Sequence, residues 1–165
     1  MIPNTYTETL SEIKIYISSI YNDLLSENIG KFLRWFLDSL KIHFSRKIII
    51  RQYKKWDILL IDLGQNIWSE ICKRRPCVVF SEKKYNHTDS LVVIPLKSYK
   101  NKSVSKFEIM IKADKDNLLY KNSLVSFISI REISKKRIIK HLWRFNAYDM
   151  NNISNKFLDF FGYKK

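Results

Sequence analysis

The spacing of apolar residues divides the chain into two parts. Between residues 10 and 24, and again between residues 29 and 44, apolar side chains recur every three or four positions. This spacing is typical of amphipathic helices, which place such residues on one face. Residues 26–28 interrupt the two stripes, and Asn28 is suited to cap the second helix. We therefore predict a helical hairpin over the first part of the chain.

From Trp56 onward the apolar runs are short and polar segments separate them, which is typical of strands. The predicted strands cover residues 58–63, 77–81, 91–96, 107–111 and 124–130, with residues 48–50 and 135–142 as further candidates. Residues 147–161 return to the helical spacing, and Gly162 provides a stop. The pattern predicts an α+β fold: a small, partly open β-barrel of five to seven strands with a C-terminal helix, preceded by the helical hairpin. We assign residues 1–50 to the hairpin and residues 51–165 to the sheet domain.

Positive charge is concentrated in the predicted sheet domain. The chain has a formal net charge of +14, and residues 1–50 account for only +1 of it, with six Lys or Arg against five Asp or Glu. Residues 51–165 therefore carry +13. A field of this sign attracts polyanions. We expect nucleic acid as a partner, with an anionic membrane surface or an acidic protein as the alternatives.

The sequence argues against membrane insertion, secretion and metal binding through cysteine. No apolar run approaches the roughly 20 residues that cross a bilayer, and the N-terminus lacks the basic segment and apolar core of a secretory signal. We expect a cytoplasmic location and no membrane partner. Cys72 and Cys77 are the only cysteines, so we expect packing residues rather than a zinc site or a disulfide.

One loop between two predicted strands gathers several polar and cationic residues. Ser69, Lys73, Arg74 and Arg75 lie between the strand that ends near Gly64 and the strand that begins at residue 77. The guanidinium group presents a planar fork of donors that fits phosphate oxygens and stays charged at any working pH. From these residues alone, the loop is either a phosphate-binding loop or a solvated basic loop.

Five motifs in a fixed order resemble the MazF/PemK family of toxin endoribonucleases. They are residues 57–64 (DILLIDLG), Ser69-Glu70, Arg75-Pro76, residues 92–96 (VVIPL), and Ile130-Arg131 followed by residues 133–138. The resemblance covers roughly residues 56 to 162. It implies an intracellular enzyme that cleaves single-stranded RNA at short sequences without a metal or other cofactor. It also implies a homodimer and an antitoxin protein that covers the RNA groove.

The resemblance also assigns roles to residues of the site. Attack of a 2′-hydroxyl on phosphorus needs a proton acceptor, a proton donor for the departing 5′ oxygen, and cationic groups around the phosphate. On the family pattern, Arg75 is the arginine that supports the phosphate. We expect catalytic roles for Arg75, Ser69 and Lys97, and RNA binding by Glu70, Lys73, Arg74, Ser98, Arg131 and Trp68.

The chain departs from the family pattern at three places. Lys97 stands where the family usually has threonine, Ser129 stands where it commonly has glutamine, and Trp68 and Cys72 stand where glycines often flank Ser-Glu. A lysine at position 97 could supply positive charge or carry a proton. Trp68 could stack on an unpaired base or pack in the core.

These departures keep two other functions open. One is a catalytically weakened module on the same scaffold that binds RNA or protein without cleaving it. Another is the activity of relatives that share the fold and poison gyrase, which no residue of this chain favours.

The N-terminal helices lie outside the usual extent of the family. Because their apolar stripes need a partner, we expect them to pack on the sheet domain, over the surface that an antitoxin would take.

Overall fold

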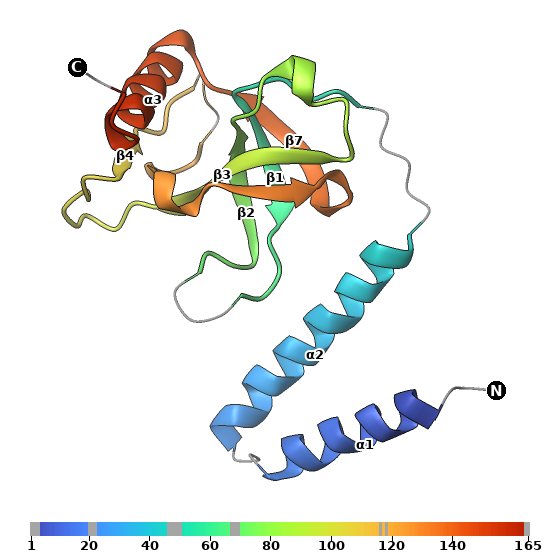
Figure 1. Ribbon diagram of the computed structural model, residues 1–165. Coiled ribbons are helices and arrows are strands. Elements are labelled where there is room, and N and C mark those ends of the chain that lie inside the picture. The colour runs from blue at the N-terminus through green and yellow to red at the C-terminus, as the bar shows by residue number, and fades with distance from the viewer. Residues whose placement is uncertain are drawn as a thin grey trace. The chain divides into compact units, whose positions relative to one another are not determined.

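The computed structural model describes residues 4–19, 23–45, 51–66, 70–115, 117 and 119–163. The chain forms two compact units, Met1–Phe44 and Ser45–Lys165, which are coloured blue to cyan and green to red in Figure 1. The candidate strand at residues 48–50 lies outside the described residues. The predicted boundary after residue 50 therefore stays a prediction.

The first unit contains two helices, α1 (Asn4–Ser19) and α2 (Asp23–Phe44). The prediction that residues 26–28 separate the helices was wrong, because they lie within α2. Serine and asparagine lower helix stability by only a few tenths of a kcal/mol each relative to better helix formers, which a 22-residue helix tolerates. The apolar stripes of α1 and α2 line a common hollow of about 810 Å³, whose lining includes Ile13 and Phe32.

The second unit is built on a seven-stranded antiparallel sheet. Its strands are β1 (Asp57–Asp62), β2 (Arg74–Val79), β3 (Ser90–Ser98), β4 (Glu108–Ile111), β5 (Ser123–Ser126), β6 (Arg131–Ser134) and β7 (Ile138–Arg144). The order is β4-β5-β3-β2-β1-β7, and β6 pairs with β3. Within the described residues the end strands β4 and β7 do not pair with each other, so the sheet is open. The predicted α+β class and the strand number are confirmed.

The predicted strand at residues 124–130 contains the end of one strand and a turn that leads into the next. β5 ends at Ser126, a 3-10 turn covers Phe127–Ser129, and β6 begins at Arg131. The side chain of Phe127 is 1% exposed, so the turn itself is anchored in the core. β6 pairs with the first half of β3 and β5 pairs with its last three residues. A single long strand therefore supports both short ones.

Two clusters of buried side chains lie on the two faces of the sheet. Along β2, Cys77 and Val79 belong to one cluster and Val78 belongs to the other, as the alternation of a strand requires. The helix α3 (Ala147–Phe160) contacts β4 and buries Ile153 in the second cluster. It lies beside β4 in Figure 1. The predicted C-terminal helix is confirmed.

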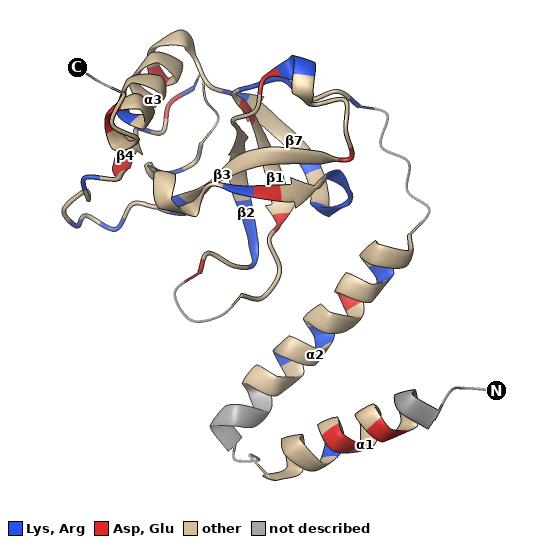
Figure 2. Ribbon diagram, viewed as in Figure 1, with Lys and Arg blue, Asp and Glu red and all other residues tan. Residues whose placement is uncertain are grey.

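Charge differs between the two units, as Figure 2 shows. Both acidic and basic residues occur along the coloured parts of α1 and α2, whereas Lys and Arg gather at the loops and strand ends of the sheet unit. No helix in the described part of the chain has the length and apolar character that crossing a bilayer requires.

Candidate functional site

The loop between β1 and β2 is closed at its base by backbone hydrogen bonds. The amide of Leu63 donates to the Lys73 carbonyl (3.0 Å), and the amide of Lys73 donates to the Gly64 carbonyl (2.7 Å). Gly64 and Lys73 both have left-handed backbone angles, with φ of 79° and 67°. β2 begins at the next residue, Arg74, so the loop base fixes where the two arginines leave the sheet. Residues 67–69, which include the predicted site residues Trp68 and Ser69, lie outside the described residues.

Arg75 is half-buried and is tied to this loop. Its Nε donates to the carbonyl of Cys72 at 2.8 Å. β2 and β3 are antiparallel and pair Cys77 with Pro95. Arg75 is two residues before Cys77, and Lys97 is two residues after Pro95. The two side chains therefore share one face of the sheet. Among the described carboxylates, none forms an ion pair with Arg75. The loop therefore orients the guanidinium, and no carboxylate in the described part of the chain is within ion-pair distance of it.

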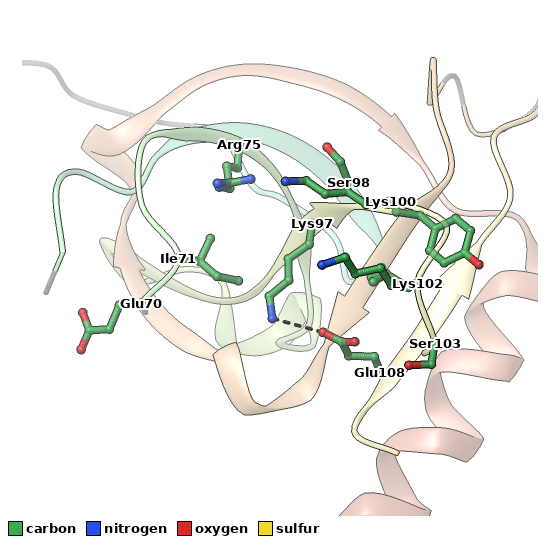
Figure 3. A pocket seen from close by; sticks show the side chains of 11 residues that line it. Glu70, Ile71, Arg75, Lys97, Ser98, Lys100, Lys102, Ser103 and Glu108 are labelled. Carbon is green, nitrogen blue, oxygen red and sulfur yellow. Dashed lines mark hydrogen bonds and ion pairs between the residues drawn. The ribbon is translucent and has the colours of Figure 1, made fainter. Parts of the chain in front are cut away.

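Lys97 is held by two partners on neighbouring strands. Its Nζ donates to Glu108 Oε1 at 3.1 Å and to Ser126 Oγ at 3.2 Å. β5 lies between β3 and β4, so the lysine side chain spans one strand to reach Glu108. The Glu108 side chain is 9% exposed and that of Lys97 is one-third exposed. Figure 3 shows the Lys97 ammonium directed at the carboxylate.

A hollow of about 430 Å³, which we call the first hollow, opens beside these side chains (Figure 3). Its lining residues are Glu70, Ile71, Arg75, Lys97, Ser98, Tyr99, Lys100, Lys102, Ser103, Glu108 and Leu124. Four of them are cationic and two are acidic, and Lys97 and Glu108 are paired with each other. In Figure 3 the ammonium groups of Lys100 and Lys102 point inward from the loop that follows β3. The first hollow therefore has an excess of positive charge.

A smaller cavity of about 220 Å³, the second hollow, shares part of its wall with the first. Its lining residues are Arg74, Arg75, Pro76, Leu96, Lys97, Ser98, Leu119, Tyr120, Lys121 and Ser123. Arg75, Lys97 and Ser98 line both hollows. The two hollows thus adjoin at the start of β2 and the end of β3.

The other predicted site residues fall in different places. Glu70 lines the first hollow. Arg74 lines the second hollow and forms an ion pair with Asp62, its Nε lying 3.6 Å from Oδ2. Lys73 and Arg131 are not in the lining of either hollow. Arg131 instead donates to the Ile71 carbonyl at 3.5 Å, and this bond supports the β1–β2 loop.

Cys77 lies beneath the arginines and is chemically inert. Burial raises the pKa of its thiol to about 12, although the positive charges of Arg131 and Arg75 lower the pKa in part. The thiol is therefore protonated at physiological pH and acts as a packing group, as the sequence predicts.

Several residues of the first hollow were not predicted from the sequence. Tyr99, Lys100, Lys102 and Glu108 line it, and none was among the expected site residues. The sequence contained a signal for the lysines, since two more lysines follow Lys97 within five positions.

No group of three or more His, Cys, Asp or Glu among the described residues comes together in a way that could hold a metal ion.

Comparison with known proteins bears on this fold and site. A model of the family described as "PemK-like, MazF-like toxin of type II toxin-antitoxin system" matches residues 54–161. No protein of curated function matches the sequence. This result leaves the family model and the solved structures as the basis for comparison.

Solved structures of MazF proteins share the fold of the sheet unit. MazF from Deinococcus radiodurans has a TM-score of 0.56 and 19% identity, covering 68% of this chain and 98% of its own. A mycobacterial endoribonuclease in complex with its cognate antitoxin has a TM-score of 0.55 and 18% identity, with the same coverage. The MazE–MazF complex from Deinococcus radiodurans has a TM-score of 0.54 and 18% identity, covering 69% of this chain and 99% of that chain. At these identities the likeness shows the fold alone.

Proposed function

Because the chain belongs to the PemK-like, MazF-like toxins of type II toxin–antitoxin systems, we propose that it is an endoribonuclease that cleaves single-stranded RNA without a metal ion. The observation that carries the proposal is the position of Arg75. Its half-buried guanidinium is anchored by Cys72 and lines a hollow with three lysines. A mycobacterial protein of the same fold is an endoribonuclease.

Arg75 would bind the scissile phosphate. A guanidinium offers two parallel N–H donors to a pair of phosphate oxygens. The hydrogen bond from Nε to the Cys72 carbonyl orients the group before RNA arrives. A donor positioned in advance stabilises the extra charge that develops around phosphorus without reorganising during the reaction. Lys100 and Lys102 would add positive charge along the RNA backbone.

Lys97 and the β1–β2 loop would serve the proton transfers. The 2′-oxygen bonds to phosphorus, the bond from phosphorus to the 5′ oxygen breaks, and the products are a 2′,3′-cyclic phosphate and a 5′-hydroxyl. The Lys97 ammonium can donate a proton to the departing 5′ oxygen, and the Glu70 carboxylate can accept the 2′-hydroxyl proton. Ser69 remains a candidate to orient the phosphate. Ser98 lines both hollows, and its hydroxyl would donate to the RNA.

A cleavage assay tests the proposal. Purified protein is incubated with single-stranded RNA and a chelator, and Arg75→Ala is compared with the natural chain. Loss of this donor is expected to lower the rate on the order of 10²–10³-fold. Arg144→Ala is the matched control, because this exposed arginine on β7 is in the lining of neither hollow. Equal rates for Arg75→Ala and the natural chain would refute the assignment.

The second candidate function, a binding module without cleavage, has one observation in its favour. Lys97 occupies the position of the family's usual threonine, and its ammonium is already engaged by Glu108 and Ser126. RNA that binds in the same assay but remains intact would support this module. RNA carrying a 2′-O-methyl group at every position serves as the uncleavable reference.

We also propose an antitoxin and a second copy of the chain as partners. The two complexes noted above, one mycobacterial and one from Deinococcus radiodurans, each contain an antitoxin bound to a toxin of this fold. The excess positive charge of the first hollow suits an acidic segment of such a protein. Light scattering of the purified chain measures whether it is a dimer. Induced expression of the natural chain and of Arg75→Ala measures whether the substitution relieves growth inhibition.

A further inference from the structure

The second hollow has no role in the reaction described above, yet it adjoins the reaction site. Arg75, Lys97 and Ser98 form a wall that is common to both hollows. A phosphate bound at Arg75 is joined to one nucleotide on each side. If one of these nucleotides occupies the first hollow, the space nearest to the other is the second hollow.

The two hollows carry the same kinds of side chain. The first contains Tyr99 with Lys100 and Lys102, and the second contains Tyr120 with Lys121. The segments that supply them are joined, because the amide of Tyr99 donates to the Asn122 carbonyl at 3.0 Å. An aromatic ring beside a cation is the combination that binds a base by stacking and its phosphate by charge. This repetition indicates that both hollows suit nucleotides.

Tyr120 is the most exposed aromatic side chain among the described residues that line either hollow. It is 87% exposed, and the Nζ of Lys121 lies 5.6 Å from the centre of its ring. The ammonium therefore lies over one face of the ring, and most of the side chain is open to a ligand. Arg74 adds a second cation to the lining of the same hollow; its side chain is 68% exposed, and its Nε lies 3.6 Å from Asp62 Oδ2.

We propose that the second hollow is a nucleotide subsite next to the scissile phosphate. Tyr120 stacks on an unpaired base, and Lys121 and Arg74 contact the phosphate of that nucleotide. The inference rests on the proposed function, which places the scissile phosphate at Arg75. Stacking on the open ring requires a base that is free of its own neighbours, so the ligand is single-stranded.

Binding of uncleavable RNA tests the subsite separately from catalysis. Fluorescence anisotropy measures the affinity of mixed-sequence 2′-O-methyl oligonucleotides, from dinucleotides to octanucleotides, for the full chain and for Tyr120→Ala. The variant is expected to bind the longer oligonucleotides about 5- to 150-fold more weakly, which is the range for loss of one stacked base. Tyr120→Phe keeps the ring and is expected to bind like the natural chain.

Tyr85 provides a matched control. It is 59% exposed, the Nζ of Lys84 lies 4.9 Å from its ring centre, and it is in the lining of neither hollow. Tyr85→Ala is expected to leave affinity unchanged. Unchanged affinity in Tyr120→Ala, an equal loss in Tyr85→Ala, or no binding of any oligonucleotide by the natural chain would overturn the subsite. Binding that depends on Tyr120 without cleavage of unmodified RNA would refute the nuclease but retain the subsite.

Discussion

Replacing Lys97 by methionine should destabilise the protein far more than a surface lysine substitution does. The replacement leaves the carboxylate of Glu108, 9% exposed, without its cationic partner. At 3.1 Å the attraction between the two charges is about 1.3 kcal/mol in bulk water and about 5 kcal/mol at an effective dielectric constant of 20. Desolvation offsets part of this gain. An acceptor left buried and unsatisfied typically costs about 1–3 kcal/mol, with charged groups at the upper end.

We therefore expect Lys97→Met to lower the free energy of unfolding by about 2–3 kcal/mol. For a unit of this size, that change corresponds to a fall in melting temperature of roughly 6–15 °C. The double variant Lys97→Met/Glu108→Leu removes both charges and should recover most of the loss, because replacing both partners by apolar groups is nearly neutral. It should recover stability without recovering RNA cleavage, since the proposed proton donor is absent.

Urea denaturation of the single and double variants measures the coupling between the two residues. The ion pair of Lys156 and Asp159 is the control, because it joins residues three apart on α3 at 2.9 Å and its aspartate is half exposed. Lys156→Met should change stability by no more than about 0.5 kcal/mol. The reasoning is refuted if the Lys97 and Glu108 effects add without coupling, or if Lys97→Met costs no more than Lys156→Met.

Four further outcomes are expected. Because burial raises the pKa of Cys77 to about 12, iodoacetamide at pH 8 should label the half-exposed Cys72 in the folded protein and leave Cys77 unmodified. Mass spectrometry measures the labelling, and rapid labelling of Cys77 would contradict this expectation. Phe127→Ala should lower the free energy of unfolding by about 3–5 kcal/mol in urea, since its ring is fully buried, and a loss below about 1 kcal/mol would refute that packing role. Burial also raises the pKa of Asp149 above its ordinary 3.8. The folded state therefore favours the protonated carboxyl, and the stability that this protonated form contributes is lost as pH rises. Asp149→Asn should therefore be more stable than the natural chain at pH 7, with an advantage that shrinks as pH falls toward 3.8, and a pH-independent difference would count against it. Deleting residues 1–45 should lower the melting temperature if the N-terminal helices pack on the sheet unit as expected, whereas an unchanged melting temperature and unchanged growth inhibition would identify an independent attachment.

The sequence predicted most of the sheet because strand alternation is a local property. The runs beginning at residues 58 and 91 match β1 and β3 to within one or two residues at most ends. The prediction failed at residues 124–130, where apolar residues recur beyond Ser126 at Phe127 and Ile128 but the backbone turns. Apolar content alone cannot separate a strand from a buried turn, since both place side chains in the core.

The site was only partly accessible from sequence for a related reason. Arg75 was identified because its motif is contiguous, and Lys97 because it follows an apolar motif of the family. The contact between Lys97 and Glu108 joins residues on two strands that do not pair with each other. It depends on the insertion of β5 between them, which no local pattern of residues predicts.

The closure of the β1–β2 loop has a consequence for how such a protein can change. Two backbone hydrogen bonds, from Leu63 to Lys73 and from Lys73 to Gly64, close the neck of the loop, and β2 starts immediately after them. A change in chain length among residues 65–69 would leave in place the start of β2, and with it the backbone of Arg75. New sequences in this part of the loop can therefore arise during evolution without moving the strand that carries Arg75.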